Sequence, residues 1–454
     1  MYSPRRFLSR IAGGLLLGAL ASGAGTAAAQ GISPQADPGL VREYDAAFGR
    51  MLRDPTNLDL TFHFAELAIR LENHEAAVGA LERLLLVNPD LPRVNLELGV
   101  LYFRLGSYKI ARTYLERAVA GPDVPVAVRT RVQPFLDEID RRTATSTISG
   151  SVFAGLRWQS NANASPAGGS VRTPFGSAAL EDQFAKKADL NAFAAATVEH
   201  AYDLGTQDGD RFVTDLTAYA TRHRTQKQLQ VGLLELRAGP KLAVLPDTLD
   251  ETWVRPYALV NGVRLGHQPY FGSWGGGVEI ETTVDDRLRL TGSAQLAARN
   301  YQNSGENPNA RELTGREGGL ELGAAYALAP RTVLQVSGGL VAEETRTAGT
   351  TNRELSLQTS LTHEYDAPFG LTSAPWSVTV SATRTWTDYD GPDPTVAPGI
   401  TRADRDWRFG LANTIGLTDD WALVVSGERA VDRSNLPNYQ FDNWTGTVGV
   451  SRTF

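Results

Sequence analysis

From Thr145 to the end of the sequence, apolar and polar residues alternate with a period of two, and this alternation restricts the fold more than any other feature. The clearest runs begin at Ile148, Leu288, Leu355 and Trp407. Neighbouring residues of a β-strand point to opposite faces, so each run predicts a strand with one apolar face and one polar face. Many such strands in succession are typical of a transmembrane β-barrel with a water-lined interior.

Reading every run of this kind gives about fourteen antiparallel strands, as barrels of this class need. We predict strands over 146–159, 187–204, 210–223, 229–245, 252–266, 270–284, 287–301, 314–328, 331–345, 353–366, 375–388, 402–418, 421–432 and 441–454.

The lengths of the connections between these strands indicate how the barrel is oriented. Tight turns fall at the second, sixth, eighth and twelfth connections, at Asp208-Gly209, Asp285-Asp286, Ala329-Pro330 and Asp419-Asp420. The longest connections are the first, seventh and eleventh, at 161–186, 302–313 and 389–401. Only the fifth, which is short, and the tenth, which is of medium length, fit poorly. Short periplasmic turns and long outer loops are typical of outer-membrane barrels, so we expect both ends of the barrel sequence in the periplasm.

Other residues of this half fit the same interpretation. All eight tryptophans lie in it, as aromatic girdles would require. We expect the charged residues of the polar faces to be solvated side chains of the lumen wall, among them Glu279, Glu281, Arg289, Arg299, Glu354 and Glu364. The final strand resembles the signal that the outer-membrane barrel assembly machinery reads, on the residues Trp444, Val448, Gly449, Val450 and Phe454.

The region from about residue 38 to residue 142 repeats itself with a period of 34, which is the period of tetratricopeptide helix pairs. The equivalent pairs are Pro55 and Pro89, Ala65 and Gly99, Ala77 and Ala111, and Leu81 and Leu115. The small residues among these, Ala65, Gly99, Ala77 and Ala111, let paired helices approach closely. Thr61 and Asn95 stand where that repeat usually has a large aromatic residue. We predict two full units, preceded by a half unit over 40–53 and followed by a capping helix over 126–141.

A stack of this kind leaves one concave face. We expect that face to carry Asp59, Phe62, Glu66, Ile69, Arg70, Arg93, Val100 and Arg104. These side chains either only solvate and pack the array, or form a groove for an extended peptide. The sequence leaves both interpretations open.

The N-terminus has the pattern of a secretory signal peptide. Arg5, Arg6 and Arg10 precede an apolar stretch over 11–20, and an A-x-A site predicts cleavage between Ala29 and Gln30. No later apolar run approaches the ~20 residues of a transmembrane helix, so a membrane-spanning mature protein would cross as a barrel. The expected domains are therefore a signal peptide over 1–29, a periplasmic helical-repeat domain over 30–142 and a barrel over 145–454.

Composition excludes several classes of function. With no cysteine, the chain has no thiol nucleophile, thiolate metal site or disulfide. A net charge of −7 and the lack of basic runs after the first ten residues argue against a nucleic-acid partner. The six histidines have no metal-ligand spacing. We therefore expect no metal, no cofactor and no enzymatic activity, and a monomer in contact with outer-membrane lipid.

Signal peptide, short tetratricopeptide array and fourteen-stranded barrel together resemble the surface lipoprotein assembly modifier family. Two short stretches add to the resemblance: residues 158–166 (WQSNANASP) after the first strand, and residues 432–439 (DRSNLPNY) before the last. The resemblance implies translocation of a passenger protein from periplasm to cell surface, the passenger being a surface lipoprotein or a secreted metal-binding or heme-binding protein. An exopolysaccharide export pore and a passive porin remain the alternatives.

Overall fold

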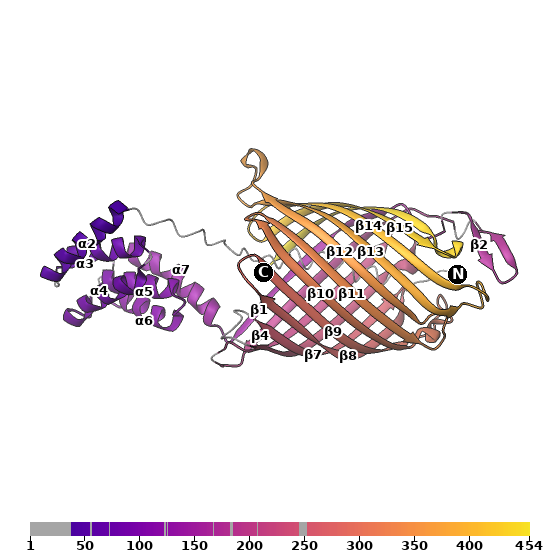
Figure 1. Ribbon diagram of the computed structural model, residues 1–454, viewed down its shortest axis with the longest axis horizontal. Coiled ribbons are helices and arrows are strands. Elements are labelled where there is room, and N and C mark those ends of the chain that lie inside the picture. The colour runs from indigo at the N-terminus through magenta and orange to yellow at the C-terminus, as the bar shows by residue number, and fades with distance from the viewer. Residues whose placement is uncertain are drawn as a thin grey trace. The chain divides into compact units, whose positions relative to one another are not determined.

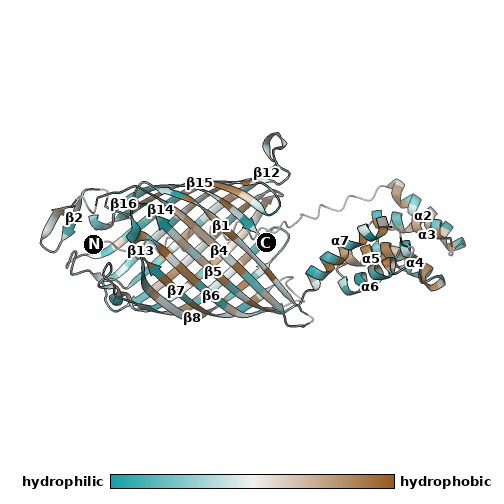
Figure 2. Ribbon diagram, turned by 180° about the vertical axis from the view of Figure 1, so that it is seen from behind, coloured by the Kyte–Doolittle hydropathy of each residue, from teal (hydrophilic) through white to brown (hydrophobic). Residues whose placement is uncertain are grey.

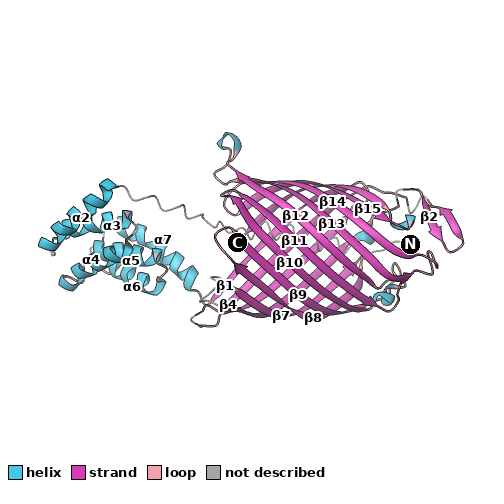
Figure 3. Cartoon of the chain, in the orientation of Figure 1, coloured by secondary structure: helices cyan, strands magenta, loops and turns pink. Residues whose placement is uncertain are grey.

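A computed structural model describes the chain over residues 38–54, 57–71, 73–121, 124, 126–166, 168–181, 185–206, 208–244 and 252–454. The predicted signal peptide and its cleavage site at Ala29 and Gln30 lie outside the described residues. The chain forms two compact units, one helical and one of β-structure, which divide between Thr147 and Ile148 (Figures 1 and 3).

The described part of the first unit holds six helices in antiparallel succession (Figure 3). They are α2 (Pro38–Arg53), α3 (Leu58–Arg70), α4 (His74–Val87), α5 (Pro92–Arg104), α6 (Tyr108–Val119) and α7 (Val126–Thr143). The pairs α3–α4 and α5–α6 are the two predicted repeat units, α2 is the preceding half unit and α7 is the capping helix. The fold class expected for this part, an α-solenoid, is confirmed.

Close helix packing depends on the small residues of the 34-residue period. Ala65, Ala77 and Ala111 are at most 2% exposed. Gly99 of α5 lies against Leu115 of α6 so closely that a Cβ at Gly99 would be 2.6 Å from the Leu115 Cγ. Such a contact leaves no room for a side chain, so the glycine is required by packing.

The two positions that lack the usual aromatic residue secure the helix starts instead. The Thr61 hydroxyl donates to the Asn57 carbonyl (3.0 Å), and the buried Asn95 amide donates to the carbonyls of Pro89 and Leu91 (3.1 Å each). Asn57 also caps α3, because its side-chain oxygen accepts from the Leu60 N–H.

The second unit is a closed barrel of fourteen strands (Figure 1). The strands are β1 (Ser146–Gln159), β4 (Asp189–Asp203), β5 (Arg211–His223), β6 (Val231–Ala243), β7 (Trp253–Leu265), β8 (Gln268–Thr283), β9 (Leu288–Tyr301), β10 (Gly315–Ala329), β11 (Thr332–Thr345), β12 (Asn352–Tyr365), β13 (Trp376–Pro392), β14 (Thr401–Gly416), β15 (Trp421–Ser434) and β16 (Phe441–Thr453). The predicted barrel class is confirmed.

Closure is made between the first strand and the last. β1 pairs with β16 from Ser151 opposite Thr453 to Gln159 opposite Thr445, and Gly150 and Phe454 exchange backbone hydrogen bonds of 2.9 and 3.0 Å. Closure satisfies the backbone of both edge strands, which is a requirement for a sheet that crosses lipid. We refer to this β1–β16 pair as the seam.

Loops at the two ends of the barrel differ, as expected from the connection lengths. Phe454 and the turns such as 284–287 and 330–331 lie at one end, and the long connections lie at the other. A hairpin of β2 (Ser170–Thr173) and β3 (Gly176–Ala179) projects from that second end (Figure 1). The sequence had indicated only a long loop there.

Hydrophobic and hydrophilic residues alternate along the barrel strands (Figure 2). Many of the hydrophobic side chains are exposed on the outer wall. Leu296 and Trp274, for example, are 73% and 71% exposed. A soluble protein rarely exposes this much contiguous apolar surface, so the wall is built to face lipid. Trp253 differs from the expected girdle, because it lies on the inner face of β7 with Arg255 and Tyr257.

Candidate functional site

Strand register identifies which side chains line the lumen. Leu355, Leu357 and Leu361 of β12 are between 41% and 52% exposed on the outer wall, so their neighbours Glu354 and Ser356 point inward. Each inward residue lies beside an inward residue of the next strand, and the inner face can therefore be followed around the barrel.

A network of ion pairs joins the inner faces of β5 to β8. Arg237 lies 2.8 Å from Glu235 and 3.2 Å from Glu279, measured between side-chain nitrogen and oxygen. Arg255 lies 2.6 Å from Asp215 and 3.5 Å from the same Glu279. The expected position of Glu279 in the lumen is confirmed, but it is not a separately solvated side chain of the wall. It is shared by two arginines from neighbouring strands.

A second network continues around the wall. Arg299 of β9 contacts Glu317 of β10 and lies 2.8 Å from Glu343 of β11, while Arg289 lies 3.7 Å from Glu281. The expectation of a solvated single charge is again wrong for Arg299, whereas Arg289 and Glu281 stay exposed to solvent at 44% and 42% and are only loosely paired. The physical reason is that strand pairing places opposite charges side by side, where an ion pair compensates for lost hydration.

A buried pair fastens the last loop to β14. Arg402 lies 2.9 Å from Asp404, and their side chains are 8% and 1% exposed. The Arg402 guanidinium carbon is 3.3 Å from the centre of the Tyr439 ring, which belongs to the loop between β15 and β16. Charge, ring and loop thus form one rigid group on the inner face.

Part of the lumen is apolar, contrary to the uniformly wet interior that the alternation predicted. Phe193, Tyr219, Tyr270 and Tyr301 form a buried cluster with aliphatic residues of β6 and β7 and with Ala310 of the loop between β9 and β10. The Tyr270 and Tyr301 rings meet edge to face at 5.2 Å between centres. This cluster gives the inner face of β4 to β9 an apolar section at the loop end.

The inner faces of β12 and β13 carry short hydroxyl side chains, which we call the hydroxyl wall. Ser360 lies opposite Ser381, and Ser356 opposite Thr385, on the inner faces of β12 and β13. Thr383 lies between these pairs. Such groups both donate and accept hydrogen bonds and carry no charge, so they can exchange partners with a passing polar chain.

Both short stretches that carried the family resemblance lie at the seam. In the first, the Asn161 amide donates to the carbonyls of Ser165 (2.9 Å) and Asp442 (3.1 Å), and the Asn161 backbone N–H donates to the Asn443 side chain (2.8 Å). Asn161 is 2% exposed. It therefore fixes the start of the first loop to the beginning of β16.

In the second stretch, two asparagine side chains each bind a backbone N–H and a backbone carbonyl, as the backbone of a neighbouring strand would. The Asn438 side-chain oxygen accepts from the Arg172 N–H (2.7 Å) and its amide donates to the Arg172 carbonyl (2.9 Å). The Asn435 side-chain oxygen likewise accepts from the Ala403 N–H (2.9 Å), and its amide donates to the Thr401 carbonyl (2.8 Å). The hairpin of β2 and β3 is thereby tied to the final loop across the seam.

Residues of the predicted assembly signal occupy both faces of β16. Trp444, Val448 and Val450 are exposed on the outer wall, and so is Phe454. Gly449 points inward, where an added Cβ would be 2.6 Å from the Phe153 ring. The structure gives the position of these residues, and their recognition by the assembly machinery stays a prediction.

In the helical unit, most of the predicted groove residues are accessible. Asp59, Glu66, Arg70, Arg93 and Arg104 are exposed. Phe62 and Ile69 are half-buried. The Arg93 guanidinium lies 4.3 Å from the centre of the Phe62 ring, so α3 and α5 share a cation–π contact on this face.

Val100 is the exception among the predicted groove residues. It is 8% exposed and packs in the core with Leu96, Ala111 and Leu115. Leu96 and Val100 are four residues apart and therefore lie on one face of α5, the face that α6 covers. Val100 supports the array and offers no accessible surface.

Glu82 of α4 links three helices of this unit. Its carboxylate accepts hydrogen bonds from Tyr102 of α5 (2.8 Å) and Tyr114 of α6 (3.1 Å), whose rings stack 5.5 Å apart. Burial, together with the hydrogen bond to Glu82, raises the pKa of Tyr102 to about 12. The pKa of Tyr114 is raised for the same reasons.

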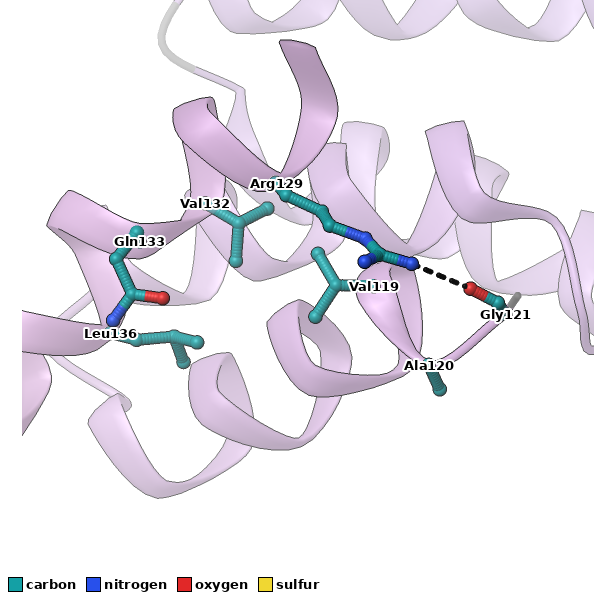
Figure 4. Close-up of a pocket in the computed structure, with 7 residues that line it drawn as sticks. All are labelled: Val119, Ala120, Gly121, Arg129, Val132, Gln133 and Leu136. Carbon is teal, nitrogen blue, oxygen red and sulfur yellow. Dashed lines mark hydrogen bonds between the residues drawn. The ribbon is translucent and has the colours of Figure 1, made fainter. Parts of the chain in front are cut away.

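A small pocket of about 390 Å³ lies between the end of α6 and α7 (Figure 4). Val119, Val132 and Leu136 give it an apolar lining, and Arg129 crosses it to donate to the Gly121 carbonyl (3.2 Å). This pocket could not be predicted from the sequence, because its wall comes from two helices and the turn that precedes the second.

Closed pairing, a lipid-facing outer wall and an ionised, hydroxyl-rich lumen define the second unit as an outer-membrane β-barrel. Within the segments that the structure describes, no helix is long and apolar enough to cross a membrane. In the same segments, no group of three or more histidine, aspartate or glutamate side chains is placed to hold a metal ion.

The helical unit matches a known family: residues 65–144 fit the tetratricopeptide repeat. The chain is thus a tetratricopeptide array joined to a fourteen-stranded outer-membrane barrel. No curated protein matches its sequence.

Among solved structures, an outer-membrane channel from Pseudomonas putida is similar over 67% of this chain and 96% of its own, at 13% identity and a TM-score of 0.35. An anion-selective porin from Comamonas acidovorans is similar over 68% and 99%, at 9% identity and a TM-score of 0.34. The MamA protein is similar over 22% of this chain and 62% of its own, less than two thirds, at 13% identity and a TM-score of 0.19. The barrel assignment rests on the strand pairing itself.

Proposed function

We propose that this chain is an outer-membrane translocator, which moves a passenger protein from the periplasm to the cell surface. The passenger class follows from the family resemblance: a surface lipoprotein or a secreted protein that binds metal or heme. One observation carries the proposal, namely the union of a repeat array that has an open polar face with a barrel whose lumen has a hydroxyl wall.

Chain connectivity supports a periplasmic location for the array. Only residues 144 and 145 lie between α7 and β1 in the sequence, which favours an array on the side of the membrane where β1 begins. The long loops lie at the opposite end of the barrel, which in outer-membrane barrels is the cell surface. A passenger would therefore meet the array before it meets the lumen.

The face of α3 and α5 suits an extended peptide. Exposed Arg93, Arg70 and Arg104 can bind peptide carbonyls and carboxylates, whereas Asp59 and Glu66 can bind amides and cations. The half-buried Phe62 offers an apolar surface between them. Repeat proteins use such faces for contacts with partner chains.

The lumen suits passage more than retention. Arg237, Arg255 and Arg299 of the lumen wall are paired with carboxylates, so they present little uncompensated charge to a passenger. The hydroxyl wall on β12 and β13 offers hydrogen bonds that are individually weak, with a net worth of about 1 kcal/mol each. A polypeptide could exchange these bonds stepwise as it moves.

Removal of residues 38–143 tests the proposal. Surface proteins are released by brief protease treatment of intact cells and identified by mass spectrometry, in cells with the full chain and with the shortened chain. We expect at least one surface protein to disappear from the surface and accumulate in the periplasm. An unchanged surface proteome, with small-solute uptake also unchanged, would instead support a passive porin.

A milder variant keeps the array folded. Arg70, Arg93 and Arg104 are replaced by serine, while the packing residues Ala65, Ala77, Gly99 and Ala111 are left alone. Helicity and barrel folding should persist, and the same surface protein should be retained in the periplasm. Normal display of the surface protein in this variant would show that these three arginines do not bind the passenger, and that the array acts in another way.

A further inference from the structure

A cluster of basic side chains lies on the outer wall at the loop end of β5 to β7. Arg222 is the penultimate residue of β5, and Arg224 and Lys227 follow in the next loop. Arg264 is the penultimate residue of β7, and His267 lies in the turn before β8. All five side chains are exposed. We call this group the basic rim.

Register places the basic rim on the lipid side of the wall. Arg222 lies opposite the exposed Ala192 of β4 and on the same face of β5 as Leu216, which is 39% exposed. Arg264 is on the same face of β7 as Val260, which is 52% exposed. Since Leu216 and Val260 belong to the apolar wall, the arginines mark the height at which that wall ends.

A cavity of about 610 Å³ opens at this point. Its apolar lining comes from Leu156, Leu190 and Ala192, and its cationic lining from Arg222, Arg224 and Lys227. Leu156 is 54% exposed, so the apolar side is continuous with the lipid-facing wall. A ligand that fits must combine apolar chains with an anionic group.

Among the described residues that line the cavity there are basic side chains but no aspartate or glutamate. Elsewhere on the same rim, Arg316 lies opposite Glu344, and Arg405 lies 2.8 Å from Asp388. Two carboxylates lie close by: Glu306 approaches Gly266, and the buried Asp189 is engaged by His223 and by the backbone N–H groups of Thr225 and Gln226. Uncompensated cations at a membrane surface attract phosphate.

We propose that the basic rim binds a phosphorylated, acylated lipid of the membrane leaflet at the loop end of the barrel, of the lipid A type. Arg222, Arg224 and Lys227 hold the phosphate, and Leu156 and Leu190 contact the acyl chains. Guanidinium groups bind phosphate through two parallel hydrogen bonds. The described lining has no carboxylate for the ammonium group of a zwitterionic lipid, which favours a purely anionic headgroup. The inference needs only the barrel and is independent of the translocation proposal.

The test measures lipid A binding to the full chain in detergent micelles by native mass spectrometry. The test variant replaces Arg222, Arg224 and Lys227 with glutamine. The matched control replaces Arg316, Arg353 and Arg433, three exposed arginines of the same rim, with glutamine. We expect the Kd for diphosphoryl lipid A to rise about tenfold in the test variant, since each exposed pair contributes modestly. The control should change it less than about twofold.

Two further probes identify the ligand chemistry. Dephosphorylated lipid A should bind the full chain as weakly as diphosphoryl lipid A binds the test variant, and millimolar inorganic phosphate should not displace the lipid. The proposal is overturned if test and control variants lose affinity equally. It is also overturned if dephosphorylated lipid A binds the full chain as tightly as diphosphoryl lipid A does, or if free phosphate displaces the lipid.

Folding is checked in each variant by the change in gel mobility on heating. If the triple variant fails to fold, a double variant at Arg224 and Lys227 serves, because both residues lie in the loop outside the strands. We expect a rise in Kd of about fourfold for this double variant. Unchanged affinity in a folded double variant would also overturn the proposal.

Discussion

Single side chains in this protein act mainly by joining segments that are distant in sequence. Asn161 and Asn438 bridge the two ends of the barrel sequence, and Glu82 bridges three helices of the array. Each of these polar side chains forms hydrogen bonds to the segments that it joins. Loss of such a residue should therefore release a segment without unfolding the unit that carries it.

Replacement of Asn438 by alanine should release the hairpin of β2 and β3. The variant loses both hydrogen bonds to the Arg172 backbone. At about 1 kcal/mol of net stabilisation, this loosening corresponds to a rise of roughly fivefold in the rate of limited trypsin cleavage after Arg172. Asn309→Ala is the matched control, since Asn309 lies in the loop between β9 and β10 and its side chain makes no cap hydrogen bond. Equal cleavage in both variants would show that Asn438 does not hold the hairpin.

Helix stability should depend on pH through Tyr102 and Tyr114. A tyrosine whose pKa is raised in the folded state stabilises that state fully below the unfolded pKa of 10, and the stabilisation is lost as pH rises toward about 12. Thermal unfolding of the array, followed by circular dichroism between pH 9 and pH 12, should show this loss. The unfolding temperature of the double variant Tyr102→Phe, Tyr114→Phe should fall less over the same pH range. An equally steep fall in this variant would show that these two tyrosines do not cause the pH dependence.

At the scale of secondary structure, the barrel is held by register, and register decides which residues meet. Alternation along each strand was sufficient to predict all fourteen barrel strands within a few residues, because lipid outside and water inside leave few other solutions. The 34-residue period was sufficient for the helices. Neither pattern predicted the hairpin of β2 and β3, whose strands are four residues long and depend on Asn438.

The lumen was predicted less well for a physical reason. Whether Arg299 is solvated or paired depends on which strand residues lie beside it, and Glu317 and Glu343 are brought there by pairing with β10 and β11. The aromatic cluster likewise combines residues of β4, β5, β8 and β9. One strand read alone gives the face of a residue but not its neighbours. The sequence shows that the polar faces carry charges, but it does not show which of these charges pair with one another.

Replacement of Arg299 by glutamine should destabilise the barrel by about 2–4 kcal/mol, since it leaves Glu317 and Glu343 close together without a counter-charge. The measurement is the temperature at which half of the protein loses its folded gel mobility. A double variant, Arg299→Gln with Glu317→Gln, removes part of the excess charge and should recover part of the loss. If the double variant is less stable than Arg299→Gln, the ion-pair account is wrong.

Barrel closure should be sensitive to the inner face of β16. A side chain at Gly449 would come within 2.6 Å of Phe153 and 2.7 Å of the Ala154 carbonyl, so Gly449→Val should hinder pairing with β1. We expect a clear fall in the folded fraction on refolding into detergent. Gly446→Val is the control, because an added Cβ there meets no atom within 4 Å. Equal yields from the two variants would mean that close approach at the seam is not required.

For the whole molecule, the proposal requires one orientation in the membrane. The absence of native cysteines lets a single introduced cysteine report its own accessibility. Cysteines at Gly168 or Pro394 should react with a membrane-impermeant maleimide on intact cells, because they lie in the long connections at the loop end. Cysteines at Asp208 or Asp419 should react only after permeabilisation. Labelling of Asp208 on intact cells would reverse the orientation and place the array outside the cell.

The central claim is that one polypeptide contacts first the helical array and then the lumen. Photo-crosslinking in living cells tests it directly, with benzoylphenylalanine placed at Phe62 on the array and, separately, at Ser381 on the hydroxyl wall. We predict that mass spectrometry will identify the same exported protein in both crosslinked products, and that the Arg70, Arg93 and Arg104 serine variant will reduce both. Efficient crosslinks from neither site to any exported protein, in cells where the barrel is folded, would contradict the account.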